Sequence, residues 1–99
     1  MKHFLVEITY TAPQEAIRAA VAGHRAYLQA GYDRGLLLLS GPRIPFGMGF
    51  ILCRFESIEA LDAFFTEDPF KKEGLAEYKV SEFSPVKHQP ALTDWVAGK

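Results

Sequence analysis

The chain has 99 residues, of which 48% are hydrophobic and 23% are charged, and its formal net charge is -1. These values suit one globular domain with one modest core, and they exclude an intrinsically disordered chain. No basic block indicates nucleic-acid binding, and no apolar run approaches the length of a membrane span.

The sequence predicts a cytoplasmic protein. Its N-terminus passes directly into strand-like sequence, without an apolar segment followed by a small-residue cleavage site. The single cysteine, Cys53, cannot form an internal disulfide and lies in an apolar run, so we expect a buried thiol in a reducing compartment and not a nucleophile. No Cys/His spacing indicates a zinc site, and we expect no metal.

The first third of the chain predicts a strand followed by a long helix. Apolar and polar residues alternate over residues 2–10, as in a half-buried strand. Thr11 is expected to cap a helix that runs to about Arg34, with Gly35 as its left-handed end. Gly31 either permits close packing within this helix or ends it early.

The middle of the chain predicts two strands that are apolar on both faces. Leu36 to Leu39 is too short for a helix and is bounded by glycine and proline, and Phe50 to Phe55 has a similar character. The segment between them, Gly41 to Gly49, is rich in glycine and proline and predicts a loop or hairpin connection. Both strands are expected to be covered on both faces.

The last third predicts a second helix, a turn, a strand and a tail. Ser57 should cap a helix from Ile58 to about Glu67, which Pro69 prevents from continuing. A turn or short helix then leads to a strand over residues 76–83. We assign residues 1–85 to one domain and residues 86–99 to a C-terminal tail, whose Leu92, Trp95 and Val96 could form a short docking helix.

The resulting βαββαβ order predicts an α+β, ferredoxin-like fold, with a four-stranded antiparallel sheet and both helices on one face. The other face of this sheet also needs a cover, because two of its strands are apolar on both sides. A chain of this length has no spare element for that purpose. We therefore expect a homodimer in which two sheets pack face to face.

Two polar residues, His24 and Asp68, each continue an apolar stripe at helical spacing. The stripes are Ile17, Ala20, Val21 and Leu28 around the histidine, and Ile58, Leu61 and Phe65 before the aspartate. The two residues lie at similar distances from their predicted helix starts, so the fold can bring them together. Such a pair in an apolar pocket is a plausible general-base unit.

Each of these residues also has a structural interpretation. His24 can be a core histidine bonded to backbone, and Asp68 followed by proline is a good N-cap; a carboxylate can fill both roles because it has two oxygens. Ser40 could orient a substrate oxygen, although a turn serine is more common. Tyr27 and Phe70 are expected to line the core or the pocket.

Several short motifs resemble the YCII-related family of dimeric α/β-barrel proteins. In chain order they are His24-Arg25-Ala26-Tyr27-Leu28, Gly35, Ser40-Gly41-Pro42, Asp68-Pro69-Phe70 and Gly74-Leu75. The resemblance implies a ferredoxin-like fold, a dimer through the sheets, and an active site on His24 and Asp68, with substrate contacts near Ser40, Pro42, Tyr27 and Phe70. Relatives within and around this family resemble dehydrochlorinases of chlorinated hydroxyhydroquinones and muconolactone isomerases. This chain departs from the family pattern in the loop Pro45 to Gly49 and in its longer tail.

Two functions therefore stay open. The first is a cofactor-independent lyase or isomerase that transfers a proton on a small cyclic or aromatic, quinol-like substrate, with dehydrochlorination as one possibility. In it His24 is the base and Asp68 orients the imidazole. The second is a non-catalytic dimeric protein that binds a small molecule or acts as an accessory, and whose His–Asp pair is structural. An open pocket reaching His24 would favour the enzyme.

Overall fold

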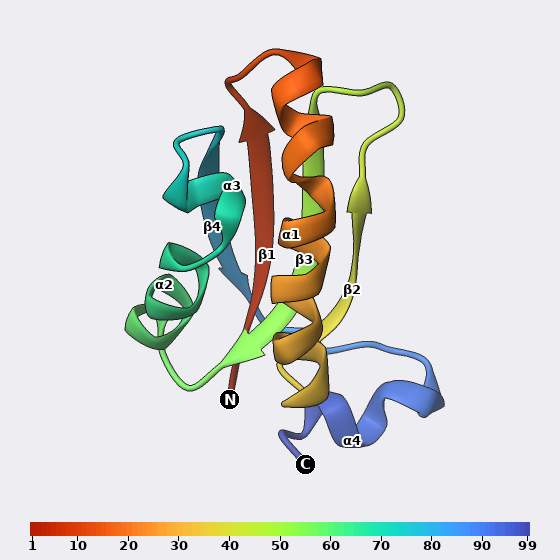
Figure 1. Cartoon of the computed structure of the whole chain (residues 1–99). Coiled ribbons are helices and arrows are strands. Elements are labelled where there is room, and N and C mark those ends of the chain that lie inside the picture. Colours follow the sequence, from red (N-terminus) through yellow and green to blue (C-terminus); the bar gives the residue numbers. More distant parts are fainter.

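A computed structural model describes all residues, 1–99, as an α+β fold in which one antiparallel sheet is covered by helices on one face (Figure 1). The strand order is β2-β3-β1-β4. This confirms the predicted ferredoxin-like fold class. The elements are β1 (Lys2–Tyr10), α1 (Gln14–Asp33), β2 (Leu37–Pro42), β3 (Met48–Phe55), α2 (Ile58–Thr66), α3 (Pro69–Lys72), β4 (Ala76–Phe83), the 3-10 helix η1 (Pro90–Leu92) and α4 (Thr93–Val96).

The core lies between the sheet and the helices. Strand β1 is central and pairs antiparallel with β3 on one side and β4 on the other. Its alternate residues Phe4, Val6 and Ile8 are buried, as the period of two requires for the face that meets the helices. The helices complete this core with fully or nearly fully buried side chains, which include Ile17, Leu28, Leu61, Phe64, Phe65 and Phe70.

Helix α1 begins differently from the prediction made from its sequence, but it ends as predicted. The prediction that Thr11 caps it is wrong: the N-cap is Pro13, no side chain caps the helix, and the Thr11 amide donates to the Leu75 carbonyl. The C-terminal prediction holds, because Gly35 follows the helix with a φ of 72°. Gly31 stays helical, and a Cβ there would lie 2.8 Å from Leu37 Cγ and from Phe64 Cζ. Its role is therefore close packing.

Strand β2 is an edge strand, and one of its faces is open in the single chain. Leu36 and Leu37 are buried, but Leu39 is 58% exposed. The pairing of β2 with β3 has an irregularity between Leu37 and Leu39. After it, Leu39 lies opposite Leu52 of β3, and Leu52 lies opposite Leu5 of β1, so the three leucines form a row on the helix-free face. The expectation that the four-leucine run is covered on both faces is therefore not met within one chain.

Helices α2 and α3 begin with the caps that their sequences predict. The Ser57 hydroxyl accepts a hydrogen bond from the Ala60 amide at 3.1 Å, and the Asp68 side chain accepts one from the Phe70 amide at 3.2 Å. Pro69 takes the first position of α3, where a missing amide hydrogen costs nothing. The short helix α3 packs against α1 and places Asp68 beside it.

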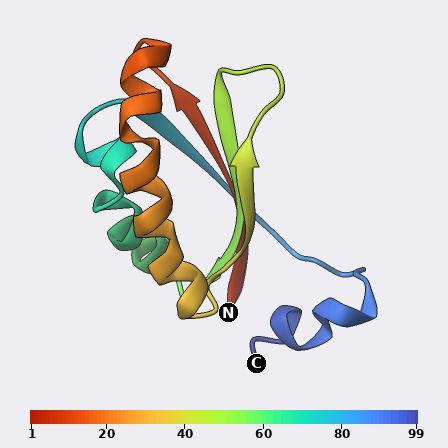
Figure 2. The same cartoon turned by 45° about the vertical axis from the view of Figure 1, so that its right-hand side comes forward.

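The C-terminal tail crosses to the side of the sheet opposite the main helices (Figure 2). There α4 meets β3 through Arg54, which is 7% exposed. Its guanidinium donates to the carbonyls of Gly35, Trp95 and Lys99, and it also lies over the Trp95 ring. The predicted docking helix is present. No helix in the chain is both long enough and apolar enough to cross a membrane.

Candidate active site

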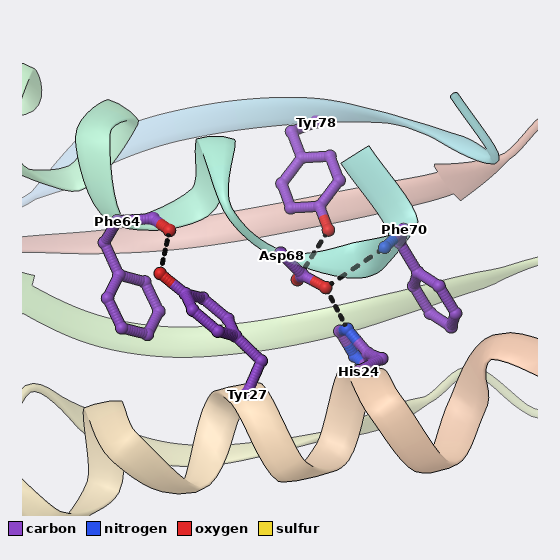
Figure 3. A network of polar contacts seen from close by, with 6 residues as sticks. All are labelled: His24, Tyr27, Phe64, Asp68, Phe70 and Tyr78. Atoms are coloured by element: carbon purple, nitrogen blue, oxygen red, sulfur yellow. Dashed lines mark hydrogen bonds and ion pairs between the residues drawn. The ribbon is translucent and has the colours of Figure 1, made fainter. Parts of the chain in front are cut away.

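The site forms where α1 meets α3. His24 lies on the face of α1 that packs against α3, and its Nδ1 is 2.7 Å from Asp68 Oδ1 (Figure 3). The predicted contact between the two residues is therefore present. The two residues are 44 positions apart in the chain, with β2, β3 and α2 between them, so only the folded topology brings them together.

Asp68 is fully buried, and both of its carboxylate oxygens accept hydrogen bonds. Oδ1 accepts from the Phe70 amide and pairs with His24, while Oδ2 accepts from the Tyr78 hydroxyl at 2.6 Å. Burial, followed by this bond to Asp68, raises the pKa of Tyr78, so the tyrosine stays protonated and donates. A buried carboxylate is stable only when it is satisfied in this way. The structure thus combines the capping and histidine-pairing roles that the sequence left open for Asp68.

The imidazole of His24 is held by two contacts. Its ring stacks on Phe70 with a centroid distance of 4.0 Å and an interplanar angle of 8°. Nδ1 is occupied by Asp68, whereas Nε2 has no hydrogen-bond partner within the protein. The side chain keeps 12% of its surface exposed. With the Nδ1 proton directed at the carboxylate, Nε2 is the nitrogen that carries the free lone pair.

A cavity of about 600 Å³ reaches His24 from the side of β2 and β3. Three of the predicted substrate-contacting residues, Ser40, Pro42 and Phe70, line it together with the histidine. Tyr27 does not line it: its hydroxyl donates to the Phe64 carbonyl at 2.5 Å and joins α1 to α2. The prediction of a substrate contact at Tyr27 is corrected to a structural bond between two helices.

Several residues of this region carry no clear signal in the sequence. Tyr78 was not singled out, although it follows Ala76 on the alternating face of the last strand, and that alternation is the signal that could have found it. The cavity is also lined by residues for which no site role was predicted, among them Tyr10, Arg18, Arg25 and Tyr32. The Tyr32 hydroxyl bonds the Ser40 hydroxyl at 2.6 Å, so the two act as one polar group.

The fold and this site define a small ferredoxin-like protein with a histidine–carboxylate pair at the wall of an apolar cavity. The chain matches the YCII-related domain over residues 1–84 and belongs to that family. A comparison with curated proteins gives no match.

Among solved structures, the chain is similar to 5-chloro-2-hydroxyhydroquinone dehydrochlorinase (TftG) from Burkholderia phenoliruptrix AC1100, in complex with 2,5-dihydroxybenzoquinone. The identity is 23%, the TM-score is 0.71, and the match covers 90% of this chain and 97% of the other. At this identity the similarity establishes a shared fold.

Proposed function

We propose that this protein is a cofactor-independent lyase or isomerase that moves a proton on a small cyclic or aromatic substrate. The observation that carries the proposal is the His24–Asp68 pair, whose free Nε2 belongs to a residue of the cavity wall. A general base must be within reach of the proton that it removes, and a histidine with one nitrogen engaged and the other free meets this condition.

Asp68 supports this role in two ways. Its Oδ1 selects the tautomer in which Nδ1 carries the proton, which leaves Nε2 to accept one. Its negative charge then stabilises the imidazolium that forms. Because the Phe70 amide and the Tyr78 hydroxyl also hold the carboxylate, the imidazole is oriented before a substrate arrives.

The similar dehydrochlorinase supports a quinol-like substrate and an elimination reaction as one possibility. In an elimination of that kind His24 would take a proton from a saturated ring carbon in the keto form of the quinol, next to the saturated carbon that bears chlorine. The bonding pair would become a carbon–carbon double bond, and chloride would leave with its electrons. In an isomerisation the same proton would return to the substrate at another position. Both reactions need one base and no electron transfer.

We further propose a homodimer in which the helix-free faces of two sheets meet. Leu5, Leu39 and Leu52 form an apolar row across three strands of that face, and the tail covers the end of the sheet near Arg54. Apolar surface of this kind on a sheet face is typical of an interface, and an isologous contact would bury the same row from both copies.

One observation favours a second candidate function, a non-catalytic binding or accessory protein. Asp68 makes three hydrogen bonds that need no substrate, and one of them caps α3. In that case His24 would serve mainly to satisfy a buried carboxylate. The cavity beside His24 would then hold a ligand without changing it.

Substitution of the pair separates the two functions. His24→Gln and Asp68→Asn should each lower turnover by about a hundredfold or more, because general acid–base assistance is worth that order. The assay is a screen of chlorinated hydroxyhydroquinones and lactones, followed by turnover and thermal midpoint of each variant. His88→Gln, in the exposed tail, is the matched control and should keep full turnover. Full turnover in a folded His24→Gln protein would refute the catalytic assignment.

A further inference from the structure

The charged side chains of the cavity wall are all basic. Two arginines of α1, Arg18 and Arg25, line the cavity together with His24, and no aspartate or glutamate does. Neither arginine forms a salt bridge or a side-chain hydrogen bond with another residue of the chain. Asp68 does not offset them at the wall, because it is fully buried behind His24 and bonded there.

The two arginines lie on the same face of α1. Arg18 and Arg25 are seven residues apart, or about two helical turns, so both side chains lie on the side of the helix that faces the cavity. Burial raises the pKa of Tyr10, and the positive charge of Arg25 opposes that shift, so the field of this guanidinium reaches a hydroxyl on the opposite wall.

The cavity also offers a neutral hydrogen-bond donor. Tyr32 and Ser40 together carry two O–H groups, and their mutual bond at 2.6 Å uses one of them. The second O–H is available to an acceptor in the cavity. Apolar side chains such as Ile8, Val21 and Phe46 make up most of the remaining wall and suit the carbon ring of a ligand.

We infer that the substrate of this cavity is a cyclic anion, with its ring against the apolar wall and its negative charge met by Arg18 and Arg25. Unpaired guanidinium groups bind carboxylate and phenolate oxygens with charge-assisted hydrogen bonds. A neutral ring of the same shape would leave both cations, which are exposed, to water alone. This inference deepens the proposed function, on which it rests for the identity of the site.

A pair of probes that differ only in charge tests the inference. Dissociation constants for 2-naphthoate and for 2-naphthamide are measured by calorimetry or by NMR titration with the full chain. We expect the carboxylate to bind at least about tenfold more tightly than the amide, and its affinity to fall as salt is raised while that of the amide stays constant.

Three arginine variants locate the charge effect. Arg18→Gln and Arg25→Gln should each weaken the binding of 2-naphthoate by about threefold to tenfold. Each should change the affinity for 2-naphthamide by less than about twofold. Arg34→Gln is the matched control: it removes the same charge from an exposed residue at the end of the same helix, outside the cavity, and should change neither probe.

Equal affinity for the two probes, no binding of either, or a loss in Arg34→Gln equal to that in the other variants would each overturn the inference. These readouts are binding constants and need no turnover. Full turnover in His24→Gln would therefore refute the proposed base while the preference for the anion stood. If turnover depended on His24 but the two probes bound equally well, only the inference of an anionic substrate would be refuted.

Discussion

At the scale of single residues, the site depends on the hydrogen bonds that the buried carboxylate of Asp68 accepts. Asp68 has four accepting positions, and the structure fills three of them from α1, α3 and β4. The bond from Tyr78 is the only one that ties Asp68 to the sheet, and it is as short as the bond to His24. Under the proposed function Tyr78 would therefore be a positioning residue, since it bonds the carboxylate that would orient the imidazole.

Removing the Tyr78 hydroxyl should loosen the pair without removing the base. Tyr78→Phe deletes one hydrogen bond to a buried charge and should lower the free energy of unfolding by about 1–3 kcal/mol. If Asp68 orients His24, kcat should fall while KM changes little, because the cavity wall is intact. Urea unfolding and steady-state kinetics measure both effects.

Tyr27→Phe is the control for this prediction, since it removes a hydroxyl that bonds the Phe64 carbonyl away from the cavity. It should lower stability and leave kcat unchanged. A Tyr78→Phe protein that loses stability but keeps the wild-type kcat would show that the Tyr78 bond does not serve the chemistry.

At the scale of elements, the approach of α1 to its neighbours is set by one glycine. Gly31 lets α1 come so close to Leu37 of β2 and Phe64 of α2 that a Cβ would lie 2.8 Å from both side chains. Gly23, on the same helix, has only Pro69 Cγ nearby, at an ordinary 3.7 Å. The helix preference for alanine is equal at both positions, so only the packing differs between them.

Alanine substitutions at the two glycines should consequently have opposite signs. Gly31→Ala should destabilise the protein by about 1–3 kcal/mol, because overpacking outweighs the helix gain of about 1 kcal/mol. Gly23→Ala should raise stability by about 0.5–1 kcal/mol. Chemical denaturation of the two variants tests this, and a stabilised Gly31→Ala would show that Leu37 and Phe64 move aside without strain.

At the scale of the whole molecule, one chain leaves the sheet with two unlike faces. The helices cover one of them, with the cavity between α1 and the strands β2 and β3, whereas the other carries the leucine row and has only the tail at one end (Figure 2). Leu39 is more than half exposed at the edge of that row. The proposed dimer would cover it.

Sedimentation at micromolar concentration should therefore give a species of twice the 11.1 kDa chain mass. Leu39→Glu should shift it toward the monomer, because it places a charge in the proposed interface. Ile44→Glu adds the same charge to a loop residue that is 95% exposed and should leave the dimer intact. A monomer in the wild-type protein would rule out the proposed assembly.

The sequence by itself determined the order of elements and the two residues at the centre of the site. These depend on local patterns: alternation over β1, helical spacing that places His24 on an apolar stripe of α1, and the Asp-Pro pair that begins α3. A polar residue on such a stripe must find a partner, and that requirement is visible without coordinates. The caps at Ser57 and Asp68 were predictable for the same reason, since each involves residues only two or three apart.

Only the tertiary structure decided which other side chains share the site. Tyr78 and Tyr27 are both tyrosines on core-facing elements, but one reaches Asp68 and the other a backbone carbonyl. Helix α1 starts after Pro13, and the amide of Thr11, the predicted cap, donates to the carbonyl of Leu75, which is distant in the sequence. The basic cavity wall likewise arises because β2 and β3 lie opposite Arg18 and Arg25. Contacts between distant segments are set by packing geometry, which no local pattern records.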